Sequence, residues 1–103
     1  MAESIENKLT QMLGEAKPTL VEFFNPTCPR CQAMAPVMDQ LRERIGSKAN
    51  ILQIDERANP DLVAKYHVHS HPVYILFIDG QEAWRDGGGK PLSELEDMIH
   101  RFE

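Results

Sequence analysis

The feature that most constrains this chain is a cysteine pair, Cys28 and Cys31, set between a strand-like segment and a segment with a helical period. The segment 19–24 before the pair is a β-branched and aromatic run, which predicts a strand. After the pair, apolar residues recur at steps of three and four up to Ile45, which predicts a helix. The pair therefore lies at a predicted strand-to-helix junction.

Two kinds of chemistry use a C-x-x-C pair, a redox dithiol and one half of a tetrahedral zinc site. Such a zinc site takes four ligands, and the chain has no second cysteine pair, so redox chemistry is favoured. Residues three apart on the first turn of a helix have Cβ atoms about 5 to 6 Å apart. At that separation two sulfurs can bond or separate with modest adjustment.

The junction predicts unequal roles for the two cysteines. Cys28 stands at the helix N-terminus, where unpaired N–H groups and the helix dipole favour negative charge, so it is the expected nucleophile. Cys31 lies one turn further in, where we expect it to be covered. The amide and the positive charge of Arg30 can help to stabilise a Cys28 thiolate.

Length and charge limit the class of protein. A chain of 103 residues predicts one domain spanning 1–103. Eleven basic residues against 16 acidic ones, a formal charge of -5, argue against nucleic acid as a partner. Membrane association is not expected either, because no apolar run approaches spanning length. Glu3 and Glu6 stand where a signal peptide carries basic residues, which predicts a cytoplasmic protein. Nothing in the composition favours more than a monomer.

Glu22 is a charged residue in the apolar middle of the predicted strand. One interpretation places it on the solvent side of an edge strand. The other makes it a buried carboxyl beneath the cysteine pair, where it would take the proton from Cys31 when that thiol attacks a mixed disulfide. The sequence leaves both open.

Two further segments invite a functional interpretation. His67, His69 and His71 alternate, as in a metal-chelating strand, although histidine is also common in loops. The glycine run 87–89 would serve either as a flexible connection or as a place where another chain approaches the backbone closely.

The predicted elements alternate along the chain. Helices are expected over 5–13, 28–44, 60–66 and 91–102, and strands over 19–25, 50–55, 73–78 and 81–85. This order predicts an α/β fold, in which a central mixed β-sheet is flanked by α-helices. With the cysteine pair at the first strand-to-helix junction, the chain resembles a thioredoxin, and a thioredoxin-like fold is implied.

The resemblance covers nearly the whole chain and implies roles for individual residues. Glu22 lies six residues before Cys28, where thioredoxins usually have a buried Asp. Pro72 falls where the family has a cis proline facing the disulfide, and the residue before it, here His71, pairs through its backbone with the substrate. Pro26, Pro36 and Tyr66 also match. The implied substrate surface consists of Thr27, Pro29, Arg30, His71, Pro72 and Gly88.

The chain departs from the family at the active-site motif. Thioredoxins usually read Trp-Cys-Gly-Pro-Cys, whereas this chain has a threonine before Cys28 and Pro29-Arg30 between the cysteines. A proline directly after the first cysteine is similar to glutaredoxins and bacterial disulfide oxidases. Because Pro29-Arg30 leaves a free amide and a positive charge near Cys28, we expect a lower pKa for the Cys28 thiol and a more oxidising dithiol than in ordinary thioredoxins.

The resemblance implies a thiol-disulfide oxidoreductase that acts on protein disulfides without a bound cofactor and receives electrons from a thioredoxin-reductase-like donor. Cys28 attacks, Cys31 resolves and Glu22 transfers a proton. Three alternatives stay open: a disulfide oxidase or isomerase of an oxidising compartment, a non-catalytic thioredoxin-like binding module, and a metal carrier that uses the cysteines and histidines.

Overall fold

The computed structural model describes residues 4–102, so Glu3 and the outermost ends of the predicted domain, 1–3 and 103, lie outside the described residues. The elements follow in the predicted order, which confirms an α/β fold. They are α1 (Ile5–Leu13), β1 (Thr19–Phe24), α2 (Pro29–Ile45), a 3-10 turn η1 (Gly46–Lys48), β2 (Asn50–Asp55), α3 (Pro60–Lys65), β3 (Val73–Ile78), β4 (Gln81–Gly87) and α4 (Leu92–Arg101).

The four strands form one mixed sheet in the order β2-β1-β3-β4. Strand β1 runs parallel to β2 and antiparallel to β3, and β3 runs antiparallel to β4. Because β1 is internal and covered on both faces, it is apolar almost throughout, as is typical of such strands. The register places Glu22 opposite Gln53 of β2 and Tyr74 of β3.

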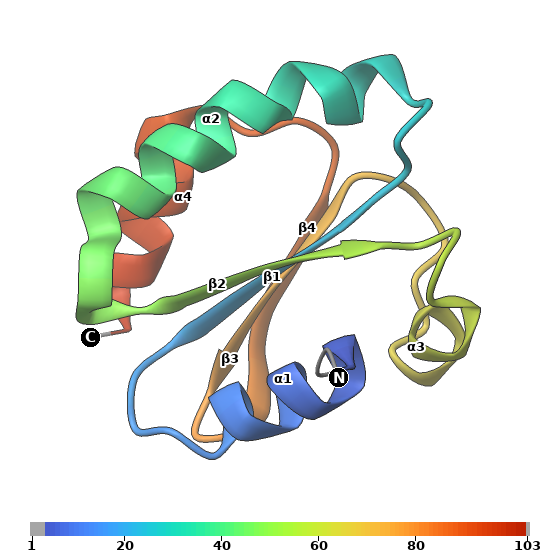
Figure 1. Ribbon diagram of the computed structural model, residues 1–103. Coiled ribbons are helices and arrows are strands. Elements are labelled where there is room, and N and C mark those ends of the chain that lie inside the picture. The colour runs from blue at the N-terminus through green and yellow to red at the C-terminus, as the bar shows by residue number, and fades with distance from the viewer. Residues whose placement is uncertain (1–3, 103) are drawn as a thin grey trace.

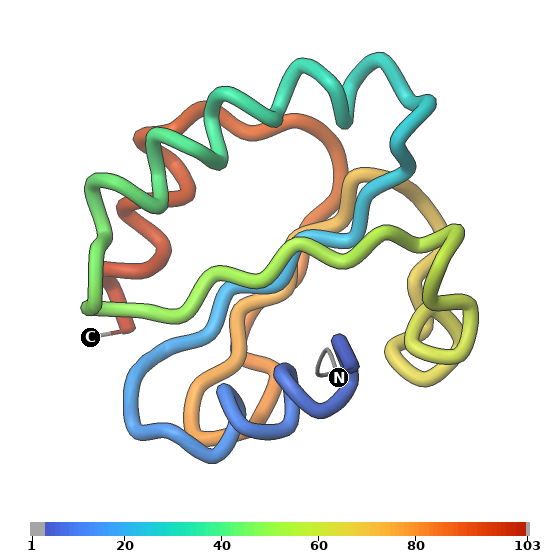
Figure 2. The backbone as a smooth tube through the Cα atoms, in the orientation of Figure 1, coloured from blue at the N-terminus to red at the C-terminus, as the bar shows by residue number. Residues whose placement is uncertain are grey.

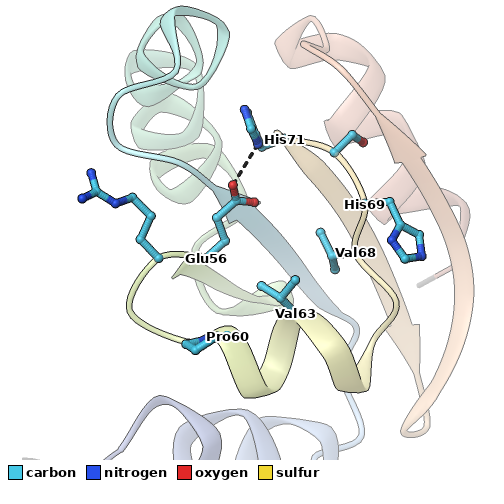
Figure 3. Close-up of a pocket in the computed structure, with 8 residues that line it drawn as sticks. Glu56, Pro60, Val63, Val68, His69 and His71 are labelled. Atoms are coloured by element: carbon cyan, nitrogen blue, oxygen red, sulfur yellow. Dashed lines mark ion pairs between the residues drawn. The ribbon is translucent and has the colours of Figure 1, made fainter.

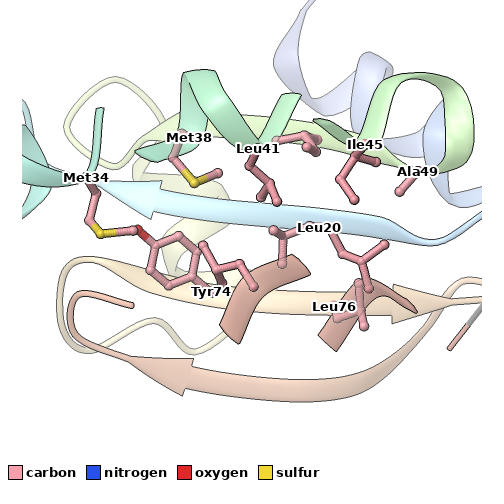
Figure 4. Close-up of a cluster of buried hydrophobic side chains, with 11 residues drawn as sticks. Leu20, Met34, Met38, Leu41, Ile45, Ala49, Tyr74 and Leu76 are labelled. Carbon is pink, nitrogen blue, oxygen red and sulfur yellow. The ribbon is translucent and has the colours of Figure 1, made fainter. Parts of the chain in front are cut away.

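Helices cover both faces of the sheet, α2 and α4 on one and α1 and α3 on the other (Figure 1). Each face has its own hydrophobic cluster. The cluster under α2 and α4 includes Met38, Leu41, Leu95, Tyr74 and Leu20 (Figure 4). The cluster under α1 and α3 includes Leu9, Phe23, Leu62, Val68 and Phe77. This three-layer arrangement covers β1 on both faces, and the cysteine junction follows directly after the end of β1.

Helix α2 begins and ends as its sequence predicts. Cys28 is the N-cap and a proline occupies the first helical position, where its missing N–H costs no hydrogen bond. The stripe of buried residues is Cys31, Met34, Met38, Leu41 and Ile45. Gly46 ends the helix with φ +58°, a conformation that favours glycine.

The topology gathers four chain segments at one end of the sheet. The register pairs Phe24 with Asp55, Phe23 with Val73, and Val73 with Gly87. The ends of β1, β2 and β4 and the start of β3 therefore lie beside the N-terminus of α2, as the backbone trace shows (Figure 2). This is the end that carries the cysteines.

Within residues 4–102, none of the helices combines the length and the apolar character needed to cross a bilayer.

Candidate active site

Cys28 occupies the N-terminus of α2, and its sulfur is held by backbone donors. Its Sγ accepts a hydrogen bond from the amide of Cys31 at 3.4 Å. That bond is the main cause that lowers the pKa of the Cys28 thiol below its ordinary value of 9.0, with further help from the Cys31 thiol and from the amide and charge of Arg30, while partial burial opposes the shift. Cys28 is the thiol that ionises more easily.

Cys31 has the opposite environment. It is buried, with 6% of its surface exposed, and its Sγ accepts a hydrogen bond from the Asn25 amide at 3.4 Å. Burial is the largest cause that raises the pKa of the Cys31 thiol to about 11, and the neighbouring Cys28 and Glu22 raise it further. Both thiols are free. Cys31 therefore stays protonated near neutrality unless a base removes its proton.

Glu22 is a buried carboxyl, so the interpretation that placed it on a solvent-facing edge strand is wrong. It lies on the internal strand β1 and only 2% of its surface is exposed. Glu22 and Cys31 both line a cavity of about 210 Å³ beside the first turn of α2. A water molecule fills about 30 Å³ of liquid, so the cavity can admit water between the two groups.

Three residues around Glu22 were missed by sequence reasoning. The Tyr74 hydroxyl donates to Glu22 Oε2 at 2.6 Å, and Gln53 Nε2 donates to Glu22 Oε1 at 3.0 Å. Arg42 of α2 in turn donates to Gln53 Oε1 at 2.9 Å. The one signal in the sequence was that Tyr74 stands in the apolar run of β3, because a tyrosine hydroxyl buried there needs a polar partner.

The Glu56 carboxylate links His71 to the loop that precedes the cysteines. Its Nδ1 lies 2.8 Å from Glu56 Oε1 (Figure 3), and the same oxygen accepts a hydrogen bond from Asn25 Nδ2 at 3.4 Å. Glu56 thereby ties the residue before Pro72 to the residue whose amide binds Cys31 Sγ. Glu56 was not singled out from the sequence, since a carboxylate after a strand carries no distinctive signal.

A second cavity, of about 310 Å³, opens beside His71 (Figure 3). Val63 and Val68 form part of its apolar wall, while Glu56, His69 and His71 supply polar groups. It lies next to the segment that the resemblance assigns to substrate contact.

Pro72 and Gly88 also lie at this end of the sheet. The His71-Pro72 peptide bond is cis. The Gly88 amide donates to the Pro72 carbonyl at 2.9 Å, and Gly88 has φ +85°, which a residue with a Cβ atom adopts only with strain. Thr27, Pro29 and Arg30 are exposed around Cys28. The structure thus brings all the predicted substrate-surface residues to the end of the sheet that holds the cysteines.

The three alternating histidines do not form a chelating cluster. Among residues 4–102, no group of three or more His, Cys, Asp or Glu side chains is arranged to hold a metal ion. His71 contacts Glu56, whereas His67 belongs to a turn whose carbonyls at 66 and 67 accept hydrogen bonds from Arg85.

Comparison with known proteins gives a consistent result. The chain matches the family model for thioredoxin over residues 2–101. It is 42% identical over 71 residues to thioredoxin X, chloroplastic, of Arabidopsis thaliana, a match that covers 69% of this chain and only 39% of that protein. It is 37% identical to the thioredoxin of Staphylococcus saprophyticus, covering 80% of this chain and 79% of that protein.

Solved structures agree with the sequence matches. A mutant thioredoxin from Halobacterium salinarum superposes with a TM-score of 0.85 at 27% identity, covering 93% of this chain and 83% of that chain. The thioredoxin of Fasciola hepatica gives a TM-score of 0.83 at 25% identity, over 96% of this chain and 91% of that one.

Proposed function

Because this chain belongs to the thioredoxin family of thiol-disulfide oxidoreductases, we propose that it reduces or exchanges disulfides in protein substrates through Cys28 and Cys31. One observation carries the assignment of roles. Cys28 is the N-cap of α2, with backbone donors on its sulfur, while Cys31 is buried one turn below it.

In the first step the Cys28 thiolate attacks one sulfur of the substrate disulfide. The substrate S–S bond breaks, its second sulfur leaves as a thiolate and is protonated from solvent, and a mixed disulfide joins Cys28 to the substrate. The lowered pKa of the Cys28 thiol supports this role, because the thiolate is the nucleophile.

In the second step Cys31 resolves the mixed disulfide. Its proton passes to Glu22 across the shared cavity, its thiolate attacks Cys28 Sγ, and the remaining substrate sulfur leaves. The dithiol loses two electrons and the substrate disulfide gains them. A thioredoxin-reductase-like donor then returns two electrons to the Cys28–Cys31 disulfide, which makes the protein an electron carrier in cell redox homeostasis.

The substrate segment lies along His71 and Pro72, close to Gly88 and to the exposed Thr27, Pro29 and Arg30. The exposure of Thr27, Pro29 and Arg30 around Cys28 supports the arrangement. The contact of His71 with Glu56, which also accepts a hydrogen bond from Asn25, supports it as well. A disulfide in an extended chain can reach Cys28 from this side.

The test is turnover of a protein disulfide by wild type, Cys28→Ser and Cys31→Ser, each with the same electron donor. We expect no turnover with Cys28→Ser, and with Cys31→Ser a covalent adduct that retains the substrate on Cys28. Turnover by Cys28→Ser at the wild-type rate would disprove the assignment of the nucleophile.

A second candidate, disulfide oxidase or isomerase, is favoured by the charge and amide of Arg30, which stabilise the Cys28 thiolate and hence the reduced form. We expect a more oxidising couple than in a variant that combines Pro29→Gly with Arg30→Pro. Equilibration of both proteins in glutathione redox buffers measures the two potentials, and equal potentials would contradict the role given to this dipeptide.

Partners and location follow from the same proposal. The protein acts as one domain and as a monomer, with neither nucleic acid nor membrane as a partner. A cytoplasmic location is the prediction for it, although the Arabidopsis relative carries a chloroplastic location in its name. Fractionation of cells that express the tagged natural gene tests the location.

A further inference from the structure

The buried carboxyl of Glu22 meets a hydrogen-bond donor at each of its two oxygens. Tyr74 of β3 donates to Oε2, and Gln53 of β2 donates to Oε1. Both donors are direct cross-strand neighbours of Glu22 in the sheet. An ionised carboxylate only accepts hydrogen bonds, whereas a protonated one must also donate, so two donors suit the ionised form.

Arg42 fixes which end of the Gln53 amide faces Glu22. A guanidinium group has donors and no acceptor, so Arg42 can bind only the amide oxygen. It donates to Gln53 Oε1 at 2.9 Å and, with its other nitrogen, to the Ile51 carbonyl at 2.9 Å. The amide nitrogen is therefore directed to Glu22. The charged Arg42 at the surface of α2 thus orients the neutral Gln53 side chain, which in turn donates to the buried Glu22.

Tyr74 is a donor that does not ionise near neutrality. It is completely buried in the cluster under α2 and α4. Burial is the first cause that raises the pKa of its hydroxyl well above the ordinary value of 10.0, and Glu22 and Cys31 raise it further. Gln53, in contrast, lines the cavity that Glu22 shares with Cys31.

From these contacts we propose that Tyr74, together with the Arg42-oriented amide of Gln53, holds Glu22 as a proton acceptor for Cys31. The inference rests on the proposed function of Glu22. Cys31 loses its proton to the Glu22 carboxylate, the Cys31 sulfur bonds to Cys28 Sγ, and the substrate sulfur leaves with the electron pair of the mixed disulfide. Tyr74, Gln53 and Arg42 touch no reacting atom and are positioning residues.

Three elements, β3, β2 and α2, place polar or titratable side chains around Glu22. Tyr74 lies on β3, neutral Gln53 on β2 and Cys31 on α2, and Arg42 acts through Gln53. Removal of one donor destabilises the carboxylate relative to the protonated carboxyl. A hydrogen bond to a charged group is strong enough that we expect the pH at half-maximal resolution to rise by about one to two units.

The experiment follows the reaction with an aromatic disulfide, 5,5′-dithiobis(2-nitrobenzoate), by stopped-flow absorbance. Cys28 releases the first thionitrobenzoate in a bimolecular phase, and Cys31 releases the second in a unimolecular phase. The unimolecular rate is recorded against pH for wild type, Tyr74→Phe, Gln53→Met, Arg42→Met and Glu22→Gln. Tyr66→Phe and Arg44→Met are matched controls, because Tyr66 packs in the other cluster and Arg44 pairs with Glu96.

We expect Tyr74→Phe and Gln53→Met to reach the wild-type plateau only at higher pH, Arg42→Met to show a smaller shift in the same direction, and both controls to keep the wild-type midpoint. Glu22→Gln should lose the plateau, and its rate should keep rising about tenfold per pH unit into the alkaline range, because burial still raises the pKa of the Cys31 thiol. In the Glu22→Gln background, Tyr74→Phe should leave the dependence of the unimolecular rate on pH unchanged, because the two residues act through one contact.

The two hypotheses fail separately. If Glu22→Gln loses the plateau while Tyr74→Phe, Gln53→Met and Arg42→Met all keep the wild-type midpoint, Glu22 is the base and the positioning inference is wrong. If Glu22→Gln keeps the wild-type profile, the proton-acceptor role itself is wrong. Arg42→Met changes only a surface side chain, so it still decides the question should the buried Tyr74→Phe variant not fold.

Discussion

Alkylation with iodoacetamide should modify Cys28 far faster than Cys31 at neutral pH. At pH 7, a thiol of pKa about 11 is ionised in about one molecule in ten thousand, whereas one at the ordinary value of 9.0 is ionised in about one in a hundred. Cys28 exceeds the second fraction because its pKa is lowered. The less acidic thiolate is intrinsically more nucleophilic, by about tenfold over two pKa units, so the net preference is about tenfold or more before burial is considered.

The assay is timed quenching followed by mass spectrometry of the peptides that carry each cysteine. With rising pH, the Cys28 rate should reach half of its maximum below pH 9, while the Cys31 rate should reach half of its maximum only at about pH 11. Burial of Cys31, with 6% of its surface exposed, should enlarge the preference further. Equal labelling of the two thiols at pH 7, or a common titration midpoint, would refute the unequal environments from which the mechanism is built.

Three other predictions test separate parts of the structure. Arg30→Ala should move the Cys28 alkylation midpoint upward by less than about one pH unit, because a solvent-exposed charge is screened and the Cys31 amide remains the main donor. Glu56→Gln should raise KM for a protein disulfide by about fivefold, with little change for a small aromatic disulfide, because a half-buried contact with His71 is worth about 1 kcal/mol. Leu95→Ala should lower the free energy of unfolding in urea by about 2 to 5 kcal/mol, since Leu95 is completely buried.

The elements with strong local signals were predictable from the sequence. The stripe from Met34 to Ile45 has a helical period and β1 is a β-branched and aromatic run, and both elements were confirmed. Strand ends were less well predicted. Strand β1 stops at Phe24, because the amide of the next residue, Asn25, donates to Cys31 Sγ instead of a strand. Strand β4 continues two residues past the predicted end, to Gly87, because Gly87 pairs with Val73.

The surroundings of Glu22 could not be predicted, because they depend on which strands become neighbours. Gln53 and Tyr74 lie 31 and 52 residues from Glu22 in sequence. Only the strand order and register place both side chains beside one carboxyl. The contact of His71 with Glu56 has the same origin, since a loop after β2 meets a loop before β3. Long-range pairing of this kind leaves no local pattern in the chain.

The opposite pKa shifts of the two thiols explain why a carboxyl lies close to Cys31. A low thiol pKa makes Cys28 a good nucleophile towards the substrate, and it also makes the Cys28 sulfur a good leaving group when the reductant later opens the disulfide. A high pKa makes the Cys31 thiolate intrinsically a strong nucleophile, but the thiolate is almost absent at neutral pH. That combination is productive only if a base within the cavity removes the Cys31 proton at the moment of attack. Glu22 is the carboxyl that shares this cavity, and each of its two oxygens accepts a hydrogen bond from a neighbouring strand.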